Sequence, residues 1–242
     1  MKLTILQWNV WYKEDIRNIT KFLREHPSDV VCLQELTIQD APEIGHTPDY
    51  IAEQLGYNHF YKEIDLGEGK IKLANGIFSK YPIVSTNWQW INQPTGTGHY
   101  DDEYRAYIEV TLDVNNTALT VATTHMSYTN GFVSTLRKEQ ELRHLVDILN
   151  TKKSNFIFSG DLNATPDSLT IKMIGNLLQN VGPTFDKPTW TTKPFSYDGF
   201  EETKLRWRLD YIFASQDVKL LETEILKTEY SDHLPVWAVV EV

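Results

Sequence analysis

The chain has 242 residues, enough for one large α/β domain with a sizeable core. Its composition is globular, with 41% hydrophobic and 23% charged residues, and its formal net charge is −10. That charge disfavours a partner held by general attraction to phosphates, such as long duplex DNA. No apolar stretch approaches the roughly 20 residues of a membrane span, and the single cysteine excludes a disulfide within the chain.

Residues 1–10 contain one lysine, and polar residues interrupt their apolar run, so the hydrophobic region of a signal peptide is missing. We therefore expect a cytoplasmic protein. The chain has no internal repeat and no Pro/Gly/Ser-rich linker, which favours a single domain over residues 1–242. We expect this domain to be a monomer.

The first part of the chain alternates strands and helices. Strands are predicted over residues 3–8 and 29–33, with a helix over 15–25 between them, whose apolar side chains recur on one face. A second helix is predicted to begin with Thr47 as N-cap and Pro48 at the first helical position. Gly56 is expected to end it.

The rest of the chain is richer in strands. Asn115-Asn116 is typical of a hairpin turn between two of them. The predicted strands cover 75–79, 83–90, 105–114, 118–125, 156–159, 208–214, 218–226 and 235–242, and the predicted helices cover 134–150 and 168–178. Residues 92–104 and 185–207 read as long loops, and Gly96-x-Gly98 opens no helix as a phosphate loop would. This order predicts two sheets packed face to face with helices outside.

Polar residues end several of the apolar runs, where ligands of α/β proteins bind. They are Asn9, Glu35, His125, Asp161, Asn163, Asp210, Asp232 and His233. Asp161 and Asn163 are two positions apart, so they share a face in extended chain. Carboxylates, amides and histidines gathered in this way suggest a metal-assisted hydrolytic site.

Taken singly, most of these residues also fit a structural role. Asn9 fits a turn, Glu35 the start of a helix or loop, and His125 a buried structural histidine. Asp210 is harder to explain, because a carboxylate in an apolar strand needs a partner. Asp232 and His233 are adjacent, so in extended chain they face opposite ways. His233 would then take its orienting acid from Asp210.

The motifs in order resemble those of the endonuclease/exonuclease/phosphatase superfamily. They run from residue 8 to 236: Trp8-Asn9, Gln34-Glu35, Asn75-Gly76, Arg105-Ala106, Thr124-His125, Gly160-Asp161-Leu162-Asn163, Leu209-Asp210-Tyr211 and Ser231-Asp232-His233. The resemblance implies a four-layer αββα sandwich and in-line attack of water on a phosphorus ester. It also implies Mg²⁺ as cofactor, with Mn²⁺ as a substitute, because hard oxygen ligands suit these ions.

The resemblance also implies roles for individual residues. Glu35 would be the principal metal ligand, with Asn9 beside it and Asp232 as a further carboxylate on the metal side. His233 would contact the scissile phosphate or help activate water, with Asp210 orienting its ring.

Four further residues would contact water or phosphate. Asp161 and Asn163 would position the attacking water and a phosphoryl oxygen, His125 would bind another oxygen, and Arg105 would add positive charge. The general base is either Asp161 or His233. Asn75 and Trp190 are further candidates for substrate binding.

The substrate is less well defined by the sequence. A phosphodiester of nucleic acid, lipid or small-molecule type is the first expectation, with nucleic acid less favoured because of the net charge. A phosphomonoesterase acting on inositol phosphates or nucleotides is one alternative, and an inactive binding module on the same fold is another. The aromatic residues of 185–207 either contact substrate or form a satellite core.

Overall fold

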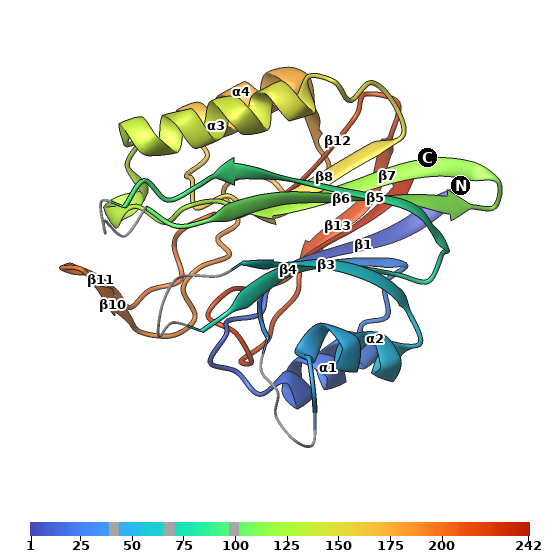
Figure 1. Cartoon of the computed structure of the whole chain (residues 1–242), viewed down its shortest axis with the longest axis horizontal. Helices are drawn as coiled ribbons and strands as arrows, with labels where there is room; N and C mark the ends of the chain where they lie inside the picture. The colour runs from blue at the N-terminus through green and yellow to red at the C-terminus, as the bar shows by residue number, and fades with distance from the viewer. Residues whose placement is uncertain (39–43, 65–70, 97–101) are drawn as a thin grey trace.

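The computed structural model describes residues 1–38, 44–64, 71–96 and 102–242. Two six-stranded sheets pack face to face, and helices cover their outer faces (Figure 1). Gly98 and part of the loop predicted at 92–104 lie outside the described residues. Among the described helices, none is both long and apolar enough to cross a membrane.

The first sheet joins the two ends of the chain. Its strand order is β13-β14-β1-β2-β4-β3, and only β1 and β2 pair in parallel. The strands are β1 Lys2–Asn9, β2 Val30–Thr37, β3 Asn58–Ile64, β4 Leu73–Ser79, β13 Lys219–Ile225 and β14 Val236–Glu241. Helix α1 (Ile16–Glu25) makes the crossover from β1 to β2, and α2 (Thr47–Leu55) packs beside it.

The second sheet repeats this design. Its order is β5-β6-β7-β8-β12-β9, and only β7 and β8 pair in parallel. The strands are β5 Ile83–Asn92, β6 Arg105–Val114, β7 Thr117–His125, β8 Phe156–Asp161, β9 Gln179–Asn180 and β12 Asp210–Ala214. A 3₁₀ turn, η1 (Asn130–Phe132), and α3 (Leu136–Leu149) connect β7 to β8, and α4 (Leu169–Leu177) follows β8.

Three apolar cores hold the four layers together. The largest lies between the sheets and includes Ile5, Val110 and Ile157. A second packs the β5–β9 sheet against α3 and α4, and a third packs the other sheet against α1 and α2. The predicted four-layer αββα sandwich is confirmed.

The structure corrects two local predictions. His46 is the N-cap of α2, so Thr47 is the first helical residue, and the Thr47 hydroxyl instead donates to the Thr37 carbonyl. The segment predicted as a loop at 185–207 contains a small hairpin of β10 (Phe195–Tyr197) and β11 (Phe200–Glu202). Two predicted turns are confirmed, since Gly56 has φ +68° and both Asn115 and Asn116 have positive φ.

Candidate active site

Strand register on the second sheet brings three predicted site residues side by side. Asp161 at the end of β8 pairs with His125 of β7 on one side and with Asp210 of β12 on the other. The preceding residue has to be glycine, because a Cβ on Gly160 would lie 2.2 Å from the Thr124 carbonyl oxygen. The close approach of β7 and β8 therefore fixes this row of polar side chains.

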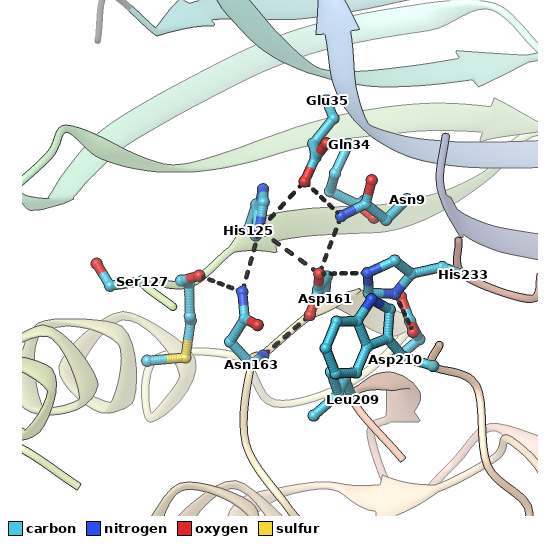
Figure 2. Close-up of polar contacts among 12 residues, drawn as sticks. Asn9, Gln34, Glu35, His125, Ser127, Asp161, Asn163, Leu209, Asp210 and His233 are labelled. Carbon is cyan, nitrogen blue, oxygen red and sulfur yellow. Dashed lines mark hydrogen bonds and ion pairs between the residues drawn. The ribbon is translucent and has the colours of Figure 1, made fainter. Parts of the chain in front are cut away.

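On the first sheet, a β-bulge presents Glu35. The pairing of β2 with β4 shifts between Leu33 and Leu36, and Glu35 has φ +61°, which is uncommon for a residue with a Cβ. The Asn9 side-chain nitrogen donates to Glu35 Oε1 at 2.9 Å and to Asp161 Oδ2 at 3.0 Å. Asn9 therefore links the two sheets at the site (Figure 2).

The segment before β14 is anchored on both sides. The Ser231 hydroxyl donates to the Asn9 carbonyl and accepts from the His233 amide, and the Trp8 indole donates to the His233 carbonyl. On the other side the segment pairs with Trp190 through an antiparallel bridge to His233. These bonds fix the backbone of the segment that carries His233.

His233 lies between two buried carboxylates. Its Nδ1 is 2.8 Å from Asp210 Oδ2, and its Nε2 is 3.6 Å from Asp161 Oδ2 (Figure 2). Burial alone would lower the pKa of His233, but Asp210, Asp161 and Asp232 outweigh it and raise that pKa well above its usual value. The surroundings therefore favour the positively charged form of His233, with Asp210 accepting from Nδ1.

His125 has the opposite protonation behaviour. Burial lowers its pKa well below the usual value, and the positive charges of Arg105, His233 and Lys138 lower it further. Its Nε2 lies 3.1 Å from the Asn163 side-chain nitrogen, which also donates to the Met126 carbonyl. His125 is thus a neutral imidazole whose Nε2 accepts from Asn163.

The site carboxylates also have perturbed pKa values. Burial raises the pKa of Asp161 to about 7, although the positive charge of His233 acts against the rise. Burial and the negative charge of Asp232 raise the pKa of Glu35. Asp161 therefore changes its protonation near neutral pH, while Glu35 and Asp232 repel each other.

These groups surround one cavity of about 470 Å³. Six polar side chains line one part of it, namely Glu35, His125, Asp161, Asn163, Asp232 and His233. Arg105 and Trp190 also line it; the Arg105 Nη2 is 2.9 Å from Glu103, while its buried Nε–H has no hydrogen-bond partner. Asn9 and Asp210 lie behind the wall, bonded to residues that form it.

Asn75 lies apart from the polar side chains that line the cavity. Its side chain is 1% exposed, and its amide donates to the Ala106 carbonyl at 3.1 Å. It therefore ties β4 of one sheet to β6 of the other, directly beside Arg105. The structure does not bring it to the wall of the cavity.

Two charged residues on the buried face of α3 were missed by the sequence analysis. The Lys138 ammonium donates to the Ser127 and Asn163 carbonyls, and the Glu141 carboxylate accepts from the Ser127 amide at 3.0 Å. They fix the loops after β7 and β8, which carry His125 and Asn163. The sequence contains one signal for them, because Lys138 and Glu141 are three residues apart and lie on the apolar side of the helix.

The carboxylate set fits a divalent cation. Asp232 Oδ1 is buried without a hydrogen-bond partner, and its charge acts on the carboxylate of Glu35. Asp161, Asp210 and His233 also place ligand atoms within 4.8 Å of one another. There, however, His233 Nδ1 and Asp210 Oδ2 are already joined by a 2.8 Å hydrogen bond, so these two ligand atoms are paired with each other. The chemistry of the donors therefore favours Glu35 and Asp232.

Sequence comparison identifies the family. A family model described as the endonuclease/exonuclease/phosphatase family matches residues 6–233. The chain belongs to this family. Comparison with curated proteins gave no match. The family's name denotes cleavage of phosphoester bonds, as the sequence motifs implied.

Solved structures of the family share the fold. An endonuclease/exonuclease/phosphatase from Beutenbergia cavernae has a TM-score of 0.77 and 22% identity over 100% of this chain and 72% of its own. A mannosyl-6-phosphatase from Bacteroides thetaiotaomicron has a TM-score of 0.70 and 16% identity over 99% and 100%. D. rerio TDP2, in complex with a single-strand DNA product, has a TM-score of 0.70 and 19% identity over 100% and 99%.

Proposed function

We propose that this protein is a divalent-metal-dependent hydrolase that cleaves a phosphodiester by in-line attack of water. One observation carries the proposal: the His233 ring, held by Asp210, points at Asp161 in a cavity that also contains the carboxylates of Glu35 and Asp232. A cation site, a base and a positively charged donor therefore surround one small volume. These are the groups that phosphoryl transfer to water requires.

Mg²⁺ would be held by Glu35 and Asp232, with Mn²⁺ able to replace it. Bound there, the ion would polarise a phosphoryl oxygen and offset its developing negative charge. The side-chain nitrogen of Asn9 faces Glu35, so Asn9 acts beside the ion by orienting that carboxylate.

Asp161 is the proposed general base. A carboxylate with a pKa of about 7 is a stronger base than an ordinary one, yet it is still substantially ionised at neutral pH. It takes a proton from the attacking water while the bond between phosphorus and the leaving oxygen breaks. Because His233 is already protonated, it acts as a hydrogen-bond donor to the phosphoryl group and not as the base.

The remaining polar residues bind the phosphoryl group. The side chains of His125, Arg105 and Asn163 line the same cavity, and the Asn163 amide donates to His125 Nε2 and to the Met126 carbonyl. Asn163 would therefore position the His125 ring, while the positive charge of Arg105 would offset the negative charge of the phosphoryl oxygens. Asn75 would contribute to substrate binding only by holding the strand that carries Arg105.

A phosphomonoesterase is the second candidate. The positive charge of Arg105, whose side chain lines the cavity, would balance the additional negative charge of a monoester. The mannosyl-6-phosphatase with a similar fold supports keeping this alternative. An inactive binding module is disfavoured, because the groups proposed for catalysis converge in the cavity.

The test is a panel of substrates assayed with and without Mg²⁺ or Mn²⁺. Purified protein should hydrolyse bis(4-nitrophenyl) phosphate, and EDTA should stop the reaction. The panel should add single- and double-stranded DNA, RNA, sphingomyelin, inositol phosphates and nucleotide monophosphates. Turnover of monoesters alone would favour the second candidate, and no turnover of any member would favour the binding module.

A further inference from the structure

Besides the polar groups, aromatic rings line the same cavity. We call them the ring wall: Tyr128, Phe132, Trp190, Phe195 and Tyr197. They come from the connection between β7 and α3, from the segment that pairs with His233, and from β10. Among the 185–207 aromatics, Trp190, Phe195, Phe200 and Trp207 form the satellite core that the sequence allowed. Trp190, Phe195 and Tyr197 also line the cavity, and their contact with substrate stays a prediction.

The ring wall is rigidly built. Phe132 meets Trp190 edge to face at 5.4 Å between centroids, and Trp190 meets Phe195 in the same way at 5.0 Å. Behind them, Trp207 packs on Phe132 at 4.9 Å, and the Trp207 indole donates to Glu202 of β11. A wall supported from behind keeps its shape when a ligand binds.

The ring wall begins directly beside the reacting groups. The Trp190 indole donates to Asp232 Oδ2 at 3.0 Å, and its ring centroid lies 6.2 Å from that of His233. A phosphoryl group near His233 would therefore place the organic group it carries against these rings. This contact would begin close to the phosphorus atom.

Apart from the hydroxyls of Tyr128 and Tyr197, the ring wall offers apolar faces and few polar atoms. Phe132 and Phe195 have none, and the one N–H of Trp190 is already bonded to Asp232. Sugar hydroxyls placed against these three rings would lose water without gaining partners. A planar ring, in contrast, extends the edge-to-face packing that the wall already shows.

We propose that the ring wall is a subsite for an aromatic ring, and that the substrate is a phosphoester whose organic group carries such a ring next to the phosphate. This inference rests on the proposed function, since the phosphate must bind beside His233. Tyr197 is the most accessible member of the wall, with 50% of its surface exposed. Its ring can therefore be replaced without disturbing a buried core.

The experiment compares two phosphonates that bind without being cleaved. Benzylphosphonate and cyclohexylmethylphosphonate have the same number of carbons, and general hydrophobicity favours the saturated one, which has more apolar surface. In the presence of Mg²⁺, calorimetry should give a Kd about three- to tenfold lower for benzylphosphonate, as expected for one or two aromatic contacts. Equal affinity, or tighter binding of the cyclohexyl compound, overturns the proposal.

Variants locate the preference. Tyr197→Leu should reduce the preference for benzylphosphonate, and Tyr197→Phe should retain it. Trp88→Ala removes an aromatic residue of similar exposure from β5 and should change nothing. A preference unaffected by Tyr197→Leu and by the milder core change Phe195→Leu would show that the ring binds elsewhere.

Two further results separate this inference from the proposed function. Glucose 6-phosphate binding more tightly than benzylphosphonate, with the advantage lost in Tyr197→Leu, would overturn the aromatic assignment in favour of a sugar. A preserved preference for benzylphosphonate, together with no hydrolysis of any phosphoester in the panel, would contradict the proposed function and leave the subsite standing.

Discussion

Asp210 and His233 form the shortest charged contact among the site residues, at 2.8 Å, and both are buried. The carboxylate holds the Nδ1 proton, so Nε2 remains directed at Asp161. The sequence assigned Asp210 as the partner of His233, and the structure brings the two together. Asp232 instead accepts from Trp190, so the two neighbours have separate contacts.

His233→Ala removes the charged donor and should lower kcat by about two to four orders of magnitude, the usual contribution of a positioned proton donor. Asp210→Asn should cost less, because the ring remains and only its orientation and charge are weakened. Steady-state rates, with circular dichroism to confirm folding, measure both. An equal or larger loss for folded Asp210→Asn would mean that Asp210 does more than orient the ring.

Asp161 sets the expected pH dependence. Its pKa is raised to about 7, mainly by burial, so the carboxylate form that acts as base is lost as the pH falls through 7. We expect kcat/KM to fall about tenfold per pH unit on the acidic side. A profile flat between pH 5 and 8, with folding intact, would exclude Asp161 as the base.

At the scale of elements, α3 does more than cover the second sheet. Lys138 donates to the Ser127 carbonyl, and Glu141 accepts from the Ser127 amide. Lys138 also donates to the Asn163 carbonyl. The loops after β7 and β8 are thereby held in register with each other. The positions of His125 and Asn163 depend on a helix that does not itself line the cavity.

Lys138→Met should leave these two carbonyls without their buried donor. We expect a loss of about 1–3 kcal/mol in the free energy of unfolding and a lower kcat, with partial rescue by Lys138→Arg. Arg143→Met on the exposed face of the same helix is the matched control. Full activity in a folded Lys138→Met protein would show that the hydrogen bonds of Lys138 contribute to stability alone.

Sequence patterns predicted the layers and most elements, because apolar periodicity and strand-end polar residues are local features. They missed β3, whose residues are mostly half-buried and do not alternate clearly, and the hairpin of β10 and β11, whose strands have three residues each. They also missed the bulge at Glu35, because the pairing that creates it lies with Gly76 and Ala74 of another strand.

At the scale of the whole molecule, the site lies where the ends of the two sheets meet. Each sheet contributes one parallel pair with a helical crossover, β1–β2 and β7–β8, and these strands carry Asn9, Glu35, His125 and Asp161. Asn9 bonds to residues of both sheets. Packing of the sheets is therefore a condition for assembling the site.

Because metal binding would relieve repulsion between Glu35 and Asp232, it should stabilise the whole fold. At a Mg²⁺ concentration ten times Kd, linkage gives about 1.4 kcal/mol, or roughly 3–6 °C in Tm. Glu35→Gln should abolish that shift and should not lower the Tm without metal, because burial and Asp232 disfavour the ionised carboxyl.

Glu53→Gln, at an exposed position of α2, should behave like wild type in this assay. Thermal unfolding with and without Mg²⁺ measures all three proteins. A Mg²⁺ shift retained in Glu35→Gln would place the cation elsewhere, with the group of Asp161, Asp210 and His233 as the next candidate.

The most direct test of the account is the rate of bis(4-nitrophenyl) phosphate hydrolysis by wild type and folded His233→Ala, each with Mg²⁺ and with EDTA. The account predicts turnover by wild type with Mg²⁺, no turnover with EDTA, and a rate at least about a hundredfold lower for His233→Ala. Equal rates for the two proteins, or turnover unaffected by EDTA, would contradict it.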